Sequence, residues 1–335
     1  MHNDMEHFYP LLFEPNLHET VWGGDRLTTW KALPAHASPV GESWEVSAVP
    51  SSIGIVANGP YKGTDLVSLI NRGPEAILGG QVSRQYKGKM PLLVKLIDAQ
   101  RDLSIQVHPN EEMAQRVHGK FGKSEMWYII SANPGAYLYV GFNRKIDETE
   151  CKQRIADGTI TDVLARHEVH PGDVFYIPAG RVHAIGAGIL LAEVQQSSDL
   201  TYRIYDYNRP GMDGKPRELH TDLAAEALDY HVESDYRTHY SPTDEGAVSL
   251  LSTPYFTIDL VETSVPFHRN LTQHDSFVVA MCLAGDCKIR VRTTGDEVLL
   301  HEGFSCMIPA VAADYDLIPV TGHTKVLDAY IANKP

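Results

Sequence analysis

Residues 171–183 read PGDVFYIPAGRVH, and this stretch decides the fold. Its spacing is Gly-x5-Pro-x-Gly-x2-His, and the named positions are taken by Gly172, Pro178, Gly180 and His183. Because glycine and proline frame the apolar run VFYI, the pattern predicts a tight turn, a short strand and a second turn. The segment therefore predicts a β-structure in which a histidine stands just beyond the second turn.

A second segment repeats part of this spacing. Residues 302–311 read EGFSCMIPAV, with Gly303 and Pro309 again in the order Gly-x5-Pro. Val311 stands where the second glycine was, and no histidine follows. The two segments resemble the second half of the cupin signature, once with its metal-ligating histidine and once without. This resemblance favours a duplicated jelly roll with one working and one blank site over the alternative of two unrelated strand–turn pairs.

Short apolar runs fill the chain around both segments. They are rich in Val, Ile, Leu and Tyr and are separated by Gly, Pro and Asn, which is typical of antiparallel sheets in a sandwich or barrel. Helical periodicity with a plausible cap or stop is confined to four short stretches, residues 65–71, 111–119, 147–157 and 221–229. We therefore expect a mainly β protein with a few short helices.

The polar residues 233–247 separate two sets of predicted strands and have the composition of a linker or long loop. We expect two cupin-like jelly-roll barrels. The first, over residues 1–240, carries His183 and the helical insertions, and the smaller second, over residues 241–335, has no metal site. Both lengths are close to ordinary domain sizes.

Composition and charge exclude several classes of protein. The chain has 335 residues, 43% of them hydrophobic, which suffices for one large core or two ordinary ones. Its 29 Lys and Arg against 43 Asp and Glu give a net charge of −14, the wrong sign for a partner such as nucleic acid or anionic lipid. An anionic ligand must therefore be held by a local cluster of basic side chains.

The expected compartment is the cytoplasm. The N-terminal residues have no basic region followed by an apolar one, and no window approaches about 18 uninterrupted apolar residues, so we expect no membrane association. The four cysteines are scattered without a Cys-x-x-Cys pair, which suits a reducing compartment better than a disulfide framework.

Four residues have the chemistry and spacing of a metal site. Gln106 and His108 are two apart on a predicted strand, so their side chains share a face. Glu125 stands just before the next strand, and His183 closes the turn described above. One amide oxygen, two imidazoles and one carboxylate suit Zn²⁺, which keeps net positive charge and an exchangeable water position. Each residue alone could be an ordinary surface or hydrogen-bonding side chain, but together they predict one metal ion.

Six stretches resemble the type I phosphomannose isomerase family, in the short bacterial form without the large helical insertion. They span most of the chain and read PLLFEPNLHETVWGGDRL, GESWEVSA, MPLLVKLIDAQRDLSIQVHPNEEMA, GKSEMWYI, PGDVFYIPAGRVHAIG and SSDLTYRIYDYNR. The resemblance implies that Gln106, His108, Glu125 and His183 bind one Zn²⁺. It also implies a small sugar-phosphate substrate and the interconversion of mannose 6-phosphate and fructose 6-phosphate through a cis-enediol.

The implied substrate needs a phosphate-binding group, for which we select Arg203 and Arg209 with the hydroxyl of Ser104. Arginine offers planar, multi-donor geometry suited to phosphate, and Ser104 lies on the same strand face as Gln106. Arg203 matches the family's active-site arginine directly. The family's usual Arg-Ala-Gly-Leu-Thr-Pro-Lys is RIYDYNR here, so Arg209 stands in for a lysine. The alternative is a solvated strand and turn.

Lys123 and Glu193 complete the predicted catalytic set with Arg203. Lys123 matches a family active-site lysine, and we expect it to relay protons or to hold an enediolate oxygen. The alternative is an exposed loop lysine. Glu193 lies between apolar residues in LLAEVQQ, so we expect it to point into the barrel beside the metal. Burial there would raise its pKa and make it a usable base, as the family also suggests. The alternative is a glutamate on the solvent face of an edge strand.

Two other classes of function share parts of this pattern. Two histidines and one carboxylate with open positions also suit non-haem Fe(II), as in a cupin oxygenase, although Gln106 and the phosphate-suited arginines argue against it. A non-catalytic cupin that only binds or stores a sugar phosphate would need neither Lys123 nor Glu193 beside the metal.

Overall fold

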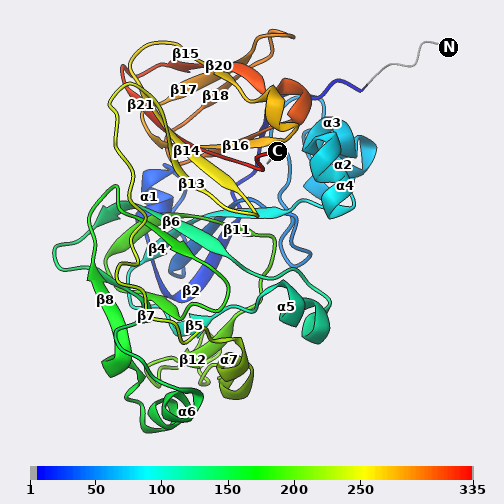
Figure 1. The fold of residues 1–335 in the computed structure, drawn as a ribbon. Coiled ribbons are helices and arrows are strands. Elements are labelled where there is room, and N and C mark those ends of the chain that lie inside the picture. Colours follow the sequence, from blue (N-terminus) through cyan, green and yellow to red (C-terminus); the bar gives the residue numbers. More distant parts are fainter. Residues whose placement is uncertain (1–5, 334–335) are drawn as a thin grey trace. The chain divides into compact units, whose positions relative to one another are not determined.

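Two compact units make up residues 6–333, the part of the chain that the computed structural model describes (Figure 1). The central unit comprises residues 17–43 and 95–238, and the terminal unit comprises the rest of the described chain. The division into domains 1–240 and 241–335 stays a prediction. The chain passes from the central to the terminal unit after Thr238, and residues 44–94 group with the terminal unit.

The strands of the central unit form two antiparallel sheets. The first has the order β2-β3-β4-β11-β6-β9, and the second has the order β12-β5-β10-β7-β8. The strands of the first are β2 (Leu17–Gly24), β3 (Val40–Val46), β4 (Leu92–Ala99), β6 (Glu125–Ala132), β9 (Val174–Ile177) and β11 (Ile189–Gln196). The strands of the second are β5 (Ile105–Val107), β7 (Tyr137–Phe142), β8 (Leu164–Glu168), β10 (His183–Ile185) and β12 (Tyr202–Tyr205). The unit boundaries fall inside β3 and β4.

The stretch 171–183 folds as predicted into a turn, a strand and a second turn. Gly172 and Gly180 have φ angles of 92° and 89°, a region that a side chain with a Cβ rarely adopts. Between them lies β9, and His183 is the first residue of β10. The two turns therefore bring His183 to the end of a strand that pairs with both β5 and β7.

The core of the central unit changes character along β6. Trp127 and Ile129 are fully buried in an apolar cluster, and Glu125 shares their side of the strand because side chains alternate. Glu125 lies opposite Gln195 of β11, and Trp127 lies opposite Glu193. The buried face is therefore apolar at one end and polar at the other, where the predicted metal ligands stand.

Helices cover the other face of the second sheet. They are α5 (Glu111–His118), α6 (Glu148–Asp157), η1 (Ile160–Val163) and α7 (Thr221–Ala227), and Figure 1 shows α7 beside β12 and α6. Asn110 and Asp147 cap α5 and α6 by accepting hydrogen bonds from backbone N–H groups, and Gly119 and Gly158 end these helices in the left-handed conformation. The predicted helices in this part of the chain are thus confirmed within a few residues.

The terminal unit also consists of two antiparallel sheets with short helices. The sheet orders are β1-β19-β16-β21-β14-β13 and β15-β20-β17-β18. The strands are β1 (Leu11–Leu12), β13 (Gly246–Ser252), β14 (Thr257–Thr263), β15 (Phe267–Asn270), β16 (Val278–Ala284), β17 (Cys287–Val291), β18 (Glu297–Leu300), β19 (Ser305–Ile308), β20 (Asp314–Pro319) and β21 (Thr324–Tyr330). The helices are α2 (Leu66–Arg72), α3 (Pro74–Leu78), α4 (Gly80–Tyr86), η2 (Thr272–His274) and η3 (Ala310–Ala312).

The interior of the terminal unit contains a buried ion cluster. Arg269 donates hydrogen bonds to Asp259 at 2.8 Å and to Asp328 at 3.0 Å. The hydroxyls of Tyr315 and Tyr330 donate to the same two carboxylates. These side chains satisfy one another, as buried charges must.

The predicted mainly β fold is confirmed. Helix α2 matches the predicted helix 65–71, and the Asp65 side chain caps it. The helices α1 (Arg26–Trp30), α3 and α4 were not predicted, and within the described residues none of these three has a side-chain hydrogen bond at its N-cap. In the described residues, no helix has the length and apolar character that crossing a bilayer requires.

Candidate metal centre and active site

Three of the predicted ligands form one tight cluster in the central unit. The Nε2 atom of His108 lies 3.3 Å from one oxygen of Glu125, and the Nε2 atom of His183 lies 3.3 Å from the other. The two Nε2 atoms are 3.1 Å apart, and all three side chains offer a ligand atom within 4.8 Å of the others. This arrangement can hold a metal ion.

Gln106 joins the cluster through the register of the sheet. It lies opposite His183 across the β5–β10 ladder, and its Nε2 atom is 3.3 Å from His183 Nε2. The hydroxyl of Ser104 donates to Gln106 Oε1 at 3.4 Å, so the predicted phosphate-binding serine contacts a predicted ligand. The oxygen and nitrogen of a side-chain amide have nearly the same shape and differ only in their hydrogen bonds. Rotation of the Gln106 amide by about 180° would therefore direct its oxygen at the histidines.

The donor set fits a cation. His108, Glu125 and His183 are at most 1% exposed. Within residues 6–333, both carboxylate oxygens of Glu125 and Nδ1 of His108 are buried and have no hydrogen-bond partner. A buried polar group without a hydrogen bond costs about 1–3 kcal/mol. A metal ion bound by the carboxylate would satisfy the two oxygens.

The orientation of His183 is determined by its other ring nitrogen. Nδ1 lies 2.8 Å from the carbonyl oxygen of Arg181, which can only accept, so Nδ1 carries the proton. The lone pair of Nε2 then faces the cluster, as in metal-ligating histidines whose second nitrogen is hydrogen-bonded. The ring of Trp127 packs edge-on against this imidazole, with the two ring centroids 5.3 Å apart.

The protonation states also suit a metal. Burial, with the nearby Lys123 ammonium, lowers the pKa of His108 to about 3, and burial lowers the pKa of His183. Burial alone would raise the pKa of Glu125, but the Lys123 ammonium beside it holds that pKa well below its usual value. Two neutral imidazoles and a carboxylate result, which are the forms that bind metal ions.

Lys123 lies at the edge of this cluster. It is 5% exposed, and its Nζ atom is 3.2 Å from a carboxylate oxygen of Glu125. Its ammonium is therefore buried beside the predicted ligands rather than exposed in a loop.

Glu193 is buried in a row of charged groups that the sequence did not reveal. One carboxylate oxygen lies 3.1 Å from Lys95 Nζ, and the other accepts a hydrogen bond from Trp127 Nε1 at 2.9 Å. Lys95 also lies 3.4 Å from Glu42. Burial raises the pKa of Glu193, although Lys95 opposes the rise. The signal for Lys95 was a lysine within the apolar run LLVKLIDA.

The predicted phosphate-binding arginines lie on and just after β12. Arg203 stands opposite Gln106 across the β12–β5 ladder, so the two side chains share a face of the sheet. Arg209 pairs with the carboxylate of Asp206 at 2.8 Å. A third arginine, Arg217, pairs with the same carboxylate at 2.6 Å and was missed, because nothing in the local pattern around it indicates this contact.

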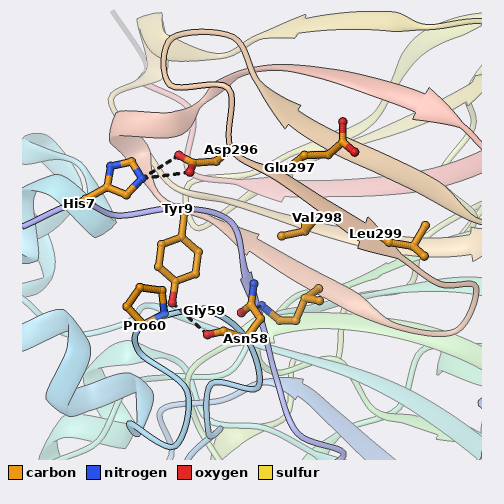
Figure 2. Close-up of a pocket in the computed structure, with 10 residues that line it drawn as sticks. His7, Tyr9, Asn58, Gly59, Pro60, Asp296, Glu297, Val298 and Leu299 are labelled. Atoms are coloured by element: carbon orange, nitrogen blue, oxygen red, sulfur yellow. Dashed lines mark hydrogen bonds and ion pairs between the residues drawn. The ribbon is translucent and has the colours of Figure 1, made fainter.

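A separate pocket lies in the terminal unit (Figure 2). It has a volume of about 500 Å³, and its lining includes His7, Tyr9, Asn58 and Asp296. The polar groups of these four are already bonded, since His7 pairs with Asp296 and the Tyr9 hydroxyl donates to the carbonyl oxygen of Asn58. None of the predicted site residues lines it.

Comparison with known proteins agrees with the resemblance seen in the sequence. Residues 11–128 match the family model described as phosphomannose isomerase type I, catalytic domain. The mannose-6-phosphate isomerase of Streptococcus mutans is 34% identical over 301 residues, covering 90% of this chain and 92% of that protein. That of Bacillus subtilis is 37% identical over 281 residues, covering 83% and 86%.

A solved structure extends the match to the whole fold. The crystal structure of a mannose 6-phosphate isomerase from Bacillus subtilis superimposes with a TM-score of 0.87 at 31% identity, and covers 97% of this chain and all of that one. Identity above 30% over nine-tenths of both sequences means that the chain belongs to the type I phosphomannose isomerase family.

Proposed function

We propose that this protein is a zinc-dependent mannose-6-phosphate isomerase that interconverts mannose 6-phosphate and fructose 6-phosphate in the cytoplasm. The observation that carries the proposal is the buried cluster of His108, Glu125 and His183, whose ligand atoms lie within 4.8 Å of one another, in a chain of this family. The relatives quoted above are named for that activity.

The proposed metal ligands are Gln106, His108, Glu125 and His183, with one Zn²⁺ per chain. Two nitrogen and two oxygen donors in a buried cluster suit Zn²⁺, and a single carboxylate leaves the bound ion with net positive charge. When bound, the ion would supply electrophilic stabilisation of the negative charge that develops on the substrate's O1 and O2.

The chain's own residues provide the remaining chemistry. Isomerisation moves a proton between C1 and C2 of the open-chain sugar through a cis-enediol, which requires a positioned base. Glu193 is the proposed base, since burial raises its pKa and two neighbours hold its carboxylate in place. Lys123, beside Glu125, is the proposed group for holding an enediolate oxygen or relaying the proton.

The substrate's phosphate is the proposed partner of Arg203, Arg209 and Ser104. Arg203 shares a sheet face with Gln106, so a sugar bound at the metal would direct its phosphate along β12. Binding the remote dianion orients the reacting carbons, which is how binding energy away from the chemistry lowers the barrier.

Metal analysis combined with a coupled assay tests the proposal. The zinc-loaded protein should form fructose 6-phosphate from mannose 6-phosphate and should exchange solvent deuterium into the substrate, and removal of the metal by a chelator should abolish both. Oxygen consumption with Fe(II) and no isomerisation would instead indicate an oxygenase. Tight sugar-phosphate binding without turnover would indicate a non-catalytic binding protein.

A further inference from the structure

Two arginines converge on one buried carboxylate just beyond β12. Asp206 is 5% exposed. Arg217 donates to it from Nε at 2.7 Å and from Nη2 at 2.6 Å, and so contacts both oxygens. Arg209 donates from Nε at 3.0 Å and from Nη2 at 2.8 Å, both to Oδ1. The single carboxylate therefore fixes two guanidinium planes at once.

The loop between these residues is shaped to bring them together. Tyr207 and Asn208 have φ angles of 56° and 52°, a left-handed conformation that is costly for tyrosine and reverses the chain after Asp206. A bridge between Pro210 and Pro216 then closes a small hairpin. As a result, positions 209 and 217 meet the same side chain although they are eight residues apart.

Arg203 borders this pair. Its Nη1 atom donates to the carbonyl oxygen of Glu218, the residue next to Arg217, at 2.9 Å. The backbone of His220 donates to the carbonyl oxygen of Arg203 at 2.8 Å, so the returning segment runs beside β12. Since Arg203 lies opposite Gln106, the arginine group is adjacent to the strand that carries the predicted metal ligands.

Arg209 connects the group to the segment that leads into β5. Its Nη1 atom donates to the carbonyl oxygen of Asp102, two residues before Ser104. Arg203 and Arg209 therefore border the segment of residues 102–106, which carries the Ser104 hydroxyl, and Asp206 joins Arg217 to Arg209.

The group has uncompensated positive charge and unused donors. Three guanidiniums face the one buried carboxylate of Asp206, and the Glu218 carboxylate that also acts on Arg203 is 84% exposed. The group therefore keeps a net positive charge in a chain whose net charge is −14. Each guanidinium has about five N–H donors, and within residues 6–333 these contacts use only part of them, while Arg203 Nε is buried without a partner. A phosphate monoester carries about −1.5 to −2 and three acceptor oxygens, so its chemistry complements the group.

We propose that Arg217 is a third phosphate-binding residue of this enzyme and that Asp206 is a positioning residue that directs Arg209 and Arg217 at the phosphate. The inference rests on the proposed function and deepens it, because it assigns the enzyme's preference for a phosphorylated over a free sugar to the loop of residues 206–217. Asp206 acts through the arginines and does not touch the substrate.

The test compares a phosphorylated and an unphosphorylated substrate. Arg217→Ala should lower kcat/KM for mannose 6-phosphate by about 10- to 100-fold, mostly through KM, as expected for one lost charge-assisted contact. Free mannose offers no phosphate, so any kcat/KM measured for it should fall much less than that for mannose 6-phosphate, and the zinc content should not change. Asp206→Asn keeps the shape of the side chain but removes the charge that aligns both arginines, so it should also lower kcat/KM more for mannose 6-phosphate than for free mannose. Arg217→Lys should recover part of the activity that Arg217→Ala loses.

A matched control and a second readout keep the outcomes separate. Arg144→Ala removes an arginine from an exposed pair with Glu150 in the same unit and should leave both substrates unaffected. Binding of inorganic phosphate, measured by calorimetry, should weaken in Arg217→Ala whether or not the wild type isomerises sugars, so failure of the proposed function remains distinguishable. Equal losses for both sugars, or unchanged phosphate binding in a folded Arg217→Ala protein, would overturn the inference.

Discussion

The carboxylate of Glu193 lies 3.1 Å from the ammonium of Lys95, across two neighbouring strands of the central unit. Trp127 holds the second carboxylate oxygen from the opposite side, and the same indole packs against the imidazole of His183. The predicted base is therefore connected to the predicted metal ligands through one aromatic side chain. This relationship allows two roles for Glu193, proton transfer or simple compensation of the Lys95 charge.

The variant Glu193→Gln separates these roles. If Glu193 transfers the proton, the nearly isosteric amide should retain fold and zinc but lose about 10²- to 10⁴-fold in turnover, the usual contribution of general-base catalysis. The matched control is Glu42→Gln, which removes the other carboxylate beside Lys95, 3.4 Å from its Nζ. Similar losses in both variants would make Glu193 a counterion, and wild-type deuterium exchange in Glu193→Gln would make Lys123 the next candidate.

Metal content is the second prediction. The purified protein should bind about one zinc ion per chain, because four donors converge at the His108 and His183 cluster. His183→Ala should remove the ion and the activity together, since it deletes the imidazole whose Nδ1 is held by the carbonyl oxygen of Arg181. Elemental analysis checks both statements. A stoichiometry near two, or full zinc and activity in the variant, would contradict the assignment.

Loss of Arg203 should affect the substrate and leave the metal in place. Arg203→Ala removes a proposed anion partner that stands opposite Gln106 but is not a ligand. Losing one charge-assisted phosphate contact should cost at least about 1.5–3 kcal/mol in kcat/KM for mannose 6-phosphate. Steady-state kinetics and zinc analysis on the same preparation measure the two effects. An unchanged kcat/KM would indicate that Arg203 is a solvated strand residue and does not bind the phosphate.

The metal-free protein should lose stability in mild acid. Burial lowers the pKa of His108 and His183 in the folded state, whereas the unfolded chain has ordinary values near 6.5. As pH falls below about 6.5, the unfolded state binds protons that the folded state excludes, so the free energy of unfolding decreases by up to about 1.4 kcal/mol per pH unit for each histidine. Above about pH 6.5, the free energy of unfolding does not change with pH through these two histidines.

Urea denaturation of the chelator-treated protein checks this slope. The matched variant carries His108→Asn and His183→Asn and retains every other histidine, so the difference between the two pH profiles belongs to the pair. Parallel profiles between about pH 7 and pH 5 would show that neither imidazole is kept neutral by burial.

Gly141 supports the fold at a point where two elements meet. Its φ angle is 75°, and a Cβ placed there would lie 2.2 Å from the ring of Tyr236. We expect Gly141→Ala to destabilise the protein by at least about 2 kcal/mol, from backbone strain and steric overlap together. Gly135→Ala is the control, because its φ of 77° is similar but an added Cβ would meet nothing within 4 Å. Equal decreases in Tm for the two variants would show that the steric overlap with Tyr236 does not affect stability.

Much of the fold could be predicted because its signals are local. Asn110 and Asp147 cap the helices that follow them, and Gly119 and Gly158 end those helices, so helical periodicity with these caps and stops located α5 and α6. The unit to which each segment belongs could not be predicted from such local signals. Residues 44–94 group with strands that begin about 150 residues later, a relation to which no short pattern refers.

The amino-acid sequence by itself determined the strand content and the identity of the four ligand candidates. Side-chain direction in a strand has a period of two, so Ser104 and Gln106 had to share a face wherever β5 came to lie. Only the tertiary structure decided which distant residues face them. Strand register placed Arg203 opposite Gln106, and the 206–217 loop returned Arg217 to Asp206. Register and loop closure depend on packing between segments far apart in the chain, which local periodicity does not encode.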